Sequence, residues 1–203
     1  MKSIQTLAIV FLSALTAAMI QAQDTKLPEP AVPGLRYYYP PEKVEPRVIE
    51  TDVCIYGGTC AGVAAVQADR MGRRVVLQEF GKHLGVLSSG GLSHTDGGDP
   101  AVCGVIAREF YKLIGQHSFR PSEAEAAFEK LLEGTSVAVH KRAHLDKVEK
   151  DGTRIVSLTM EDGLTVRAKQ FIDATYEGDL LARAGVSWHA GRELVFQSSL
   201  VTP

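Results

Sequence analysis

Two short apolar segments flank one amphipathic segment early in the chain. Residues 52–56 and 74–78 are apolar runs of the length of buried strands. Residues 61–71, between them, are rich in alanine and apolar on one face, and Gly72 follows. This pattern predicts a helix that ends at the glycine. The order strand, helix, strand predicts a parallel βαβ unit, as in α/β folds.

The pattern changes in the second half of the chain. Three apolar-alternating runs are separated by the turn sequences "KDG" and "EDG", which predicts an antiparallel β-meander. A glycine-rich loop at 81–98 precedes this half. The other predicted elements are helices at 102–116, 122–133 and 179–184, and strands at 136–140, 143–149, 153–161 and 164–174.

The amino-terminal residues are predicted to lie outside this fold. Residues 1–22 contain one lysine, then an uncharged apolar run, then small residues, as in a secretory signal peptide. A membrane anchor is the alternative, but the run is short for a span. We therefore expect an exported protein, periplasmic or extracellular, with no stable membrane span after cleavage at Ala22. Residues 23–50 hold six of the nine prolines, which predicts an extended leader.

Composition narrows the functional classes. The formal net charge is −2 and no dense Lys/Arg stripe occurs, so a nucleic-acid partner is not expected. After export, three cysteines cannot all pair within one chain. No C-x-x-C sequence occurs, so no thiolate metal site is expected. The oligomeric state is left open.

The turn after the first predicted strand has the chemistry of a phosphate site. N–H groups at a helix start carry partial positive charge and suit an anion. Gly57 allows a tight turn, Gly58 adds backbone freedom, and Gly62 allows the helix to lie close to the strand. Thr59 stands where the G-x-G-x-x-G pattern has its second glycine. Its side chain would either crowd a pyrophosphate or donate a hydrogen bond to it.

Glu79 strengthens the dinucleotide interpretation. It ends the second predicted strand, 22 residues after Gly57, where an acid accepts hydrogen bonds from adenosine ribose. A carboxylate there repels a 2′-phosphate, so NADP is not expected and FAD or NAD remains.

Two stretches together resemble a known family. "DVCIYGGTCAGVAA" with "VVLQEFGKHLGVLSSGGLSHTDGG", and later "FIDATYEGDLLARAGV", are similar to FAD-dependent oxidoreductases with a glutathione-reductase-type FAD domain. The similarity is greatest to an exported subgroup in which "YGGT" is a common variant. It implies an α/β, FAD/NAD(P)-binding Rossmann-like domain with a parallel βαβ core and an antiparallel β-meander. It also favours FAD over NAD, since simple NAD-binding domains lack the meander.

The resemblance implies a role for each matching position. The residues assigned to the pyrophosphate and the adenosine ribose are Gly57, Gly58, Thr59, Ala61 and Gly62 at the pyrophosphate, Glu79 at the ribose, and His83, Leu84 and Gly85 beside both. Those assigned to the ribityl chain and flavin ring are Ser89, Gly90 and Gly91. The backbone of Ala143 or His144 is assigned to the adenine, and Thr175 and Asp179 belong to the return motif.

The chain also departs from the family pattern. Cys60 stands where proline is usual, and the C-x4-C of the dithiol reductases is missing, so disulfide reduction is not expected. The FAD-binding domain is expected at 51–193 and to be incomplete, with 194–203 an unassigned tail of a shortened chain. The expected function is an FAD-dependent oxidoreductase, or part of one, acting on a small organic substrate; no catalytic residue can be named. A non-catalytic dinucleotide-binding module and an inactive remnant are the alternatives.

Overall fold

The structure is a computed structural model that describes residues 45–95, 102–115 and 118–188. The chain divides into two units, Met1–Tyr39 and Pro40–Pro203, and all of the described residues belong to the second. The predicted signal segment, most of the predicted leader and the predicted tail lie outside the described residues.

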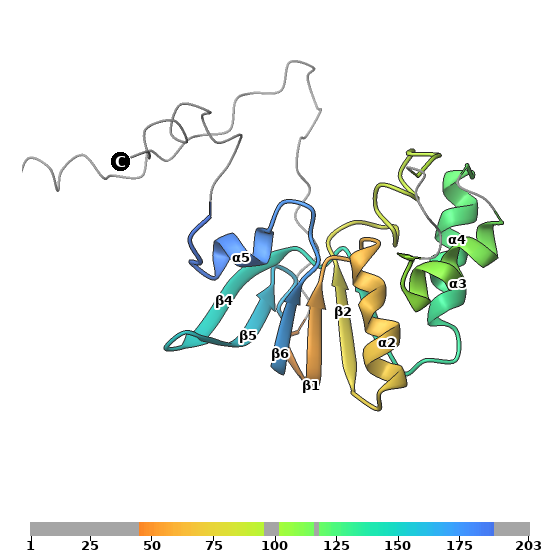
Figure 1. Ribbon diagram of the computed structural model, residues 1–203. Helices are drawn as coiled ribbons and strands as arrows, with labels where there is room; N and C mark the ends of the chain where they lie inside the picture. Colours follow the sequence, from red (N-terminus) through yellow and green to blue (C-terminus); the bar gives the residue numbers. More distant parts are fainter. Residues whose placement is uncertain (1–44, 96–101, 116–117, 189–203) are drawn as a thin grey trace, which may run out of the picture. The chain divides into compact units, whose positions relative to one another are not determined.

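Six strands form one mixed sheet in the order β3-β2-β1-β6-β5-β4. β1 pairs in parallel with β2 and β6, and β2 pairs in parallel with β3. β5 pairs antiparallel with both β4 and β6. The predicted parallel core with an antiparallel meander is confirmed (Figure 1). The strands are β1 (Arg47–Tyr56), β2 (Val75–Glu79), β3 (Ala138–Lys141), β4 (Leu145–Asp151), β5 (Arg154–Met160) and β6 (Leu164–Asp173).

Strand β1 begins earlier than predicted. It starts at Arg47 instead of Asp52, so the last residues of the predicted leader belong to the sheet. The polar residues at 50–52 interrupt the apolar run and hid this extension from the hydrophobic pattern. Backbone pairing with β6 from Arg47 onward does not depend on apolar side chains. Pro46, which has no N–H to give to a sheet, directly precedes the strand.

The predicted helices are present, with small shifts at their ends. The helix expected at 61–71 begins with a 3₁₀ turn, η1, and continues as α2. Gly115, at φ 76°, ends α3 in the left-handed conformation that glycine adopts readily. None of the described helices is long and apolar enough to cross a membrane. The helices are η1 (Ala61–Val63), α2 (Ala64–Arg70), α3 (Val105–Ile114), α4 (Pro121–Leu132) and α5 (Asp179–Arg183).

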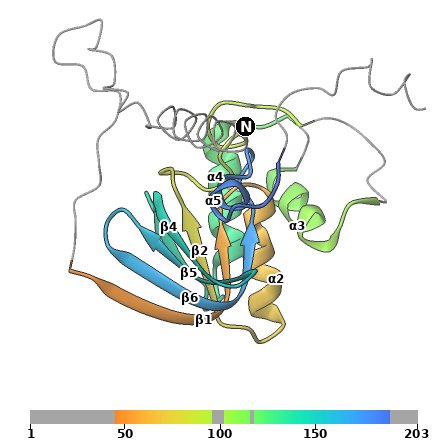
Figure 2. The same cartoon turned by 90° about the vertical axis from the view of Figure 1, so that its left-hand side faces the viewer.

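Two apolar cores lie on opposite faces of β1 and β2. Ile55 and Leu77 point into a core shared with α2, α3 and α4, which lie on one side of these strands (Figures 1 and 2). Cys54 and Val76 point into a second core with the meander. Because both faces are covered, these strands read as continuous apolar runs.

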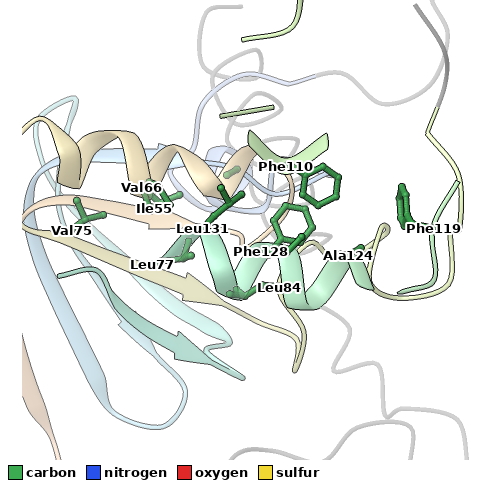
Figure 3. Close-up of a cluster of buried hydrophobic side chains, with 13 residues drawn as sticks. Ile55, Val66, Val75, Leu77, Leu84, Phe110, Phe119, Ala124, Phe128 and Leu131 are labelled. Carbon is green, nitrogen blue, oxygen red and sulfur yellow. The ribbon is translucent and has the colours of Figure 1, made fainter. Parts of the chain in front are cut away.

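Phe128 of α4 is central to the first core (Figure 3). Its ring stacks on Phe110 with centroids 4.6 Å apart, and only 2% of the residue is exposed. The core therefore links α4 to α3 and to the sheet.

We expect Phe128→Ala to lower the free energy of unfolding by about 3 to 5 kcal/mol, because it removes buried area and leaves a cavity. Chemical denaturation measures this loss. Leu113→Ala on α3 is the control, since Leu113 is 46% exposed, and should cost under about 1 kcal/mol. Equal losses in the two variants would contradict the assignment of this core.

Candidate cofactor site

Three segments that follow parallel strands meet at one edge of the sheet. They are the turn 57–62 after β1, the loop 80–91 after β2, and the turn 174–179 after β6. The arrowheads of these strands end at the same edge in Figure 1. Open α/β sheets bind ligands outside the carboxyl ends of their strands. This edge is therefore the candidate site.

The glycines of the turn are required by contacts within the protein. Gly57 has φ +109°, and a Cβ atom there would lie 2.6 Å from the carbonyl carbon of Ala174. A Cβ at Gly62 would overlap the carbonyl oxygen of Gly57. These contacts confirm the tight turn and the close helix approach. At Gly58 the requirement is space, not the predicted backbone freedom, since a Cβ would lie 2.8 Å from Leu84 Cδ2.

The Thr59 side chain is hydrogen-bonded within the protein. The residue is 2% exposed, so its side chain faces the protein interior. Its hydroxyl donates to the carbonyl oxygen of Ala174 at 2.6 Å and accepts from the N–H of Ala61 at 3.1 Å. The hydroxyl proton is therefore already donated within the protein, and a contact of Thr59 with a pyrophosphate stays a prediction. The sequence pattern did not indicate this bond, because the partner, Ala174, lies far away in the sequence.

Glu79 ends β2 as predicted and lies beside the turn. Its Oε2 accepts from the N–H of Gly58 and its Oε1 from the N–H of Gly81, both at 2.5 Å. The residue has no exposed surface. Burial raises the pKa of this carboxyl, and the two N–H donors act in the opposite direction. A carboxylate has about four acceptor positions, so two bonds leave capacity for ribose hydroxyls. Ribose binding stays a prediction.

The loop after β2 is fixed to helix α4. Gly85 donates its N–H to Gly58 at 2.7 Å, and a Cβ on it would collide with the ring of Phe128. Leu84 is buried in the first core. His83 Nδ1 lies 2.8 Å from Glu125 Oε1 on α4. These three predicted residues hold the loop in place, and none of them lines the cleft described below.

The other residues of the loop 80–91 differ from one another in burial and backbone conformation. The hydroxyl of Ser89 is buried and has no hydrogen-bond partner among the described atoms. Gly90 and Gly91 are exposed, and Gly91 has φ +135°. Val86 has φ 41°, which is strained for a β-branched residue, and it lines the cleft.

The return turn is organised by Asp173, which the sequence analysis missed. Its Oδ1 accepts from the N–H of Thr175 at 3.0 Å and from the Thr175 hydroxyl at 2.7 Å. Its Oδ2 accepts from the N–H of Leu181 at 2.8 Å. The Thr175 hydroxyl in turn accepts from the N–H of Asp179 at 2.9 Å. An acid at a strand end, two residues before a threonine, is the signal for such a turn.

A cleft of about 460 Å³ lies between the end of β1, the loop 80–91 and the return turn 174–179, and no residue of the turn 57–62 is among its lining residues. The N–H of Ala143 donates to the carbonyl oxygen of Glu79 at 2.8 Å, which brings the predicted adenine segment to the cleft. Asp179 and His144 line the cleft, while Thr175 is not among its lining residues. The lining residues are Tyr56, Phe80, Val86, His144, Leu145, Glu161, Tyr176, Glu177, Asp179 and Arg183.

Carboxylates outnumber cations in the cleft. Glu161, Glu177 and Asp179 face one arginine, Arg183, whose guanidinium donates to the carbonyl oxygen of Asp146 at 3.0 Å. Within the described ranges no cluster of three or more His, Cys, Asp or Glu side chains is suited to a metal ion. The cleft therefore favours an uncharged, partly aromatic ligand group.

Comparison with known proteins identifies the family. The family model described as FAD dependent oxidoreductase matches residues 52–198. The chain belongs to the FAD dependent oxidoreductase family. FAD is the cofactor of this family, and oxidoreductase chemistry is its activity. A search of curated proteins finds no match.

Solved structures support the fold. An FAD dependent oxidoreductase of Pseudomonas aeruginosa matches with a TM-score of 0.51 and 17% identity, over 70% of this chain and 52% of that chain. A cyclohexanone monooxygenase matches with a TM-score of 0.50 and 14% identity, over 64% of this chain and 26% of that chain. A steroid monooxygenase bound to NADP matches with a TM-score of 0.50 and 16% identity, over 62% of this chain and 26% of that chain. The chain thus spans about half or less of these proteins, and the likeness concerns the fold alone.

The buried Glu79 carboxyl gives a testable pH dependence. Burial raises its pKa, so the folded chain binds this proton more tightly than the unfolded chain. The resulting stabilisation is complete below the ordinary glutamate pKa near 4.5 and disappears as pH rises through the raised folded value. We expect the free energy of unfolding of the wild type, relative to Glu79→Gln, to fall as the pH rises above the ordinary glutamate pKa near 4.5.

Denaturant titrations at several pH values measure this difference. Glu50→Gln, at an exposed position on β1, is the matched control for removing one carboxylate. A difference that grows with pH would show that the ionised form of Glu79 is the one favoured by folding.

Proposed function

We propose that this chain is the FAD-binding part of an oxidoreductase that acts on a small organic molecule. In this proposal the adenosine half of FAD enters the cleft, the pyrophosphate crosses the turn 57–62, and the ribityl chain runs toward Ser89. The observation that carries it is the meeting of the three strand-end segments at the edge where α/β sheets bind ligands.

The residues present fit FAD in one further respect. The buried Ser89 hydroxyl has no partner among the described atoms, and an unpaired buried polar group costs about 1 to 3 kcal/mol. A hydroxyl or phosphate of a bound cofactor would pair it. The aromatic side chains Tyr56, Phe80 and Tyr176 give the cleft surfaces for an adenine ring.

The charges of the cleft favour FAD over NADP. Three carboxylates line it, and Glu79 lies next to it, so an additional phosphate on the adenosine ribose would be repelled. The adenosine of FAD has no such phosphate. When bound, FAD supplies the hydride and electron chemistry, and the chain binds and orients it.

The finer family assignment and the location are part of the same proposal. The glutathione-reductase-type subgroup is supported by the parallel core with its meander. Export to the periplasm or the medium is supported by the pattern of residues 1–22. Mature protein that begins at Gln23 when made in a secreting host would support export.

The test of cofactor binding is the visible spectrum of the chain from Gln23 onward, mixed with FAD and then desalted. We expect flavin absorption to remain with the protein. Ser89→Ala should weaken binding about fivefold, because it removes one hydrogen-bonding group worth about 1 kcal/mol. Ser93→Ala, at an exposed position two residues beyond this loop, should not change the affinity.

Folded protein that loses all flavin on desalting, and shows no saturable FAD binding by titration, would contradict the proposal. Equal effects of the two serine substitutions would contradict the placement of the ribityl chain.

A further inference from the structure

Thr59 occupies the one position where the glycine fingerprint is broken. At that position the fingerprint has glycine so that the backbone can approach the pyrophosphate. Here the residue is 2% exposed and lines a small internal void together with Leu77 and Phe128. The void measures about 10 Å³, too small for any ligand. The threonine side chain is therefore directed into the protein, and the cofactor side of the turn stays clear.

The hydrogen-bonding capacity of the Thr59 hydroxyl is committed within the protein. A hydroxyl has one donor and two acceptor positions. The donor is taken by the carbonyl oxygen of Ala174 at 2.6 Å, and one acceptor position by the N–H of Ala61 at 3.1 Å. The first bond joins two segments that are 115 residues apart in the sequence. Only serine and threonine can make both bonds from a side chain of this length.

Ala174 is held by the last residue of β1 and by the turn that follows it. Its N–H donates to the carbonyl oxygen of Tyr56 at 2.8 Å, and its carbonyl accepts from Thr59. Gly57 approaches the same peptide so closely that a Cβ would lie 2.7 Å from the nitrogen of Thr175. Thr175 is the second residue of the return turn 174–179, which Asp173 organises. The place of the first turn thus determines the place of the second.

We infer that Thr59 is a positioning residue, which fixes the turn 57–62 and the return turn 174–179 relative to each other for cofactor binding. The inference rests on the proposed FAD site, because these two segments are the ones assigned to the cofactor. In this role the threonine contributes what a fingerprint glycine cannot contribute, a hydrogen bond between the two turns.

Three substitutions at Thr59 separate this role from its alternatives. Thr59→Ser keeps the hydroxyl and should bind FAD within about threefold of the wild type. Thr59→Val keeps the shape but leaves the Ala174 carbonyl and the Ala61 N–H without this partner, and should weaken FAD binding at least tenfold. Thr59→Gly restores the fingerprint glycine and should also weaken binding severalfold. Dissociation constants come from quenching of flavin fluorescence on the full chain.

A control corrects for general loss of stability. Val166→Ala lies in the second core, away from both turns, and lowers stability without touching the hydroxyl. All variants are measured at a temperature where each is folded, as judged by circular dichroism. Tighter FAD binding by Thr59→Gly would overturn the inference, since it would show that the side chain obstructs the pyrophosphate. Unchanged FAD binding by Thr59→Val would also overturn the inference. So would a loss of FAD affinity in Thr59→Val that is no greater than the loss in Val166→Ala.

Amide hydrogen exchange gives a second readout that needs no cofactor. We expect Thr59→Val, but not Thr59→Ser, to speed exchange at Ala61 and at Thr175 at least tenfold in the free protein. If the wild type binds no FAD, the proposed function fails, and this readout still tests the link between the turns. Unchanged exchange at both amides in Thr59→Val would overturn the inference.

Discussion

The close approach of Gly57 to Ala174 is the constraint on which the rest of the site depends. Two backbone segments meet there with no room for a Cβ atom, and Gly57 has to adopt φ +109°. The hydrogen bonds from Ala174 to Tyr56 and from Thr59 to Ala174 hold this contact from both sides. Strands β1 and β6 are neighbours in the sheet, so their turns emerge side by side. The contact makes these turns one structural unit.

Glu79 adds the third strand to that unit. Its two oxygens accept N–H groups from Gly58 and Gly81, so one carboxylate connects the turn after β1 with the loop after β2. Such charge-assisted bonds to backbone N–H groups are stronger than bonds between neutral groups, which offsets part of the cost of burying the charge. The same acid that the fingerprint assigns to ribose therefore also shapes the edge in the free protein. Cofactor binding and local stability are expected to depend on it together.

The local sequence pattern was sufficient to predict most of the architecture. The apolar runs and the turn sequences identified the parallel core and the meander because side-chain periodicity and turn chemistry act over a few residues. The start of β1 was missed, since pairing of its polar residues with β6 is set by backbone bonds between distant segments. The sequence correctly located the glycines of the turn. It did not predict why position 58 requires glycine, because the side chain that leaves no room there, Leu84, belongs to another loop.

The candidate site was less predictable for the same reason. The orientation of Thr59 depends on Ala174, which no local pattern connects with it. The aromatic residues of the cleft, Tyr56, Phe80 and Tyr176, come from three separate strand ends and share no motif. Asp173 could have been found from its place before Thr175, since an acid at a strand end commonly closes a turn through its own side chain.

Alkylation of Cys60 tests most directly whether FAD lies against the turn. Cys60 is exposed beside Thr59, with its sulfur 3.3 Å from Ser88 Oγ, while Cys54 is buried and its pKa is raised to about 12 by burial. Saturating FAD should slow the reaction of Cys60 with a maleimide at least tenfold. The reaction of Cys103, which lies elsewhere and is partly exposed, should keep its rate. Peptide mass spectrometry follows both reactions. Equal protection of both cysteines, or none at Cys60 when FAD is bound, would contradict the placement of the cofactor at this edge of the sheet.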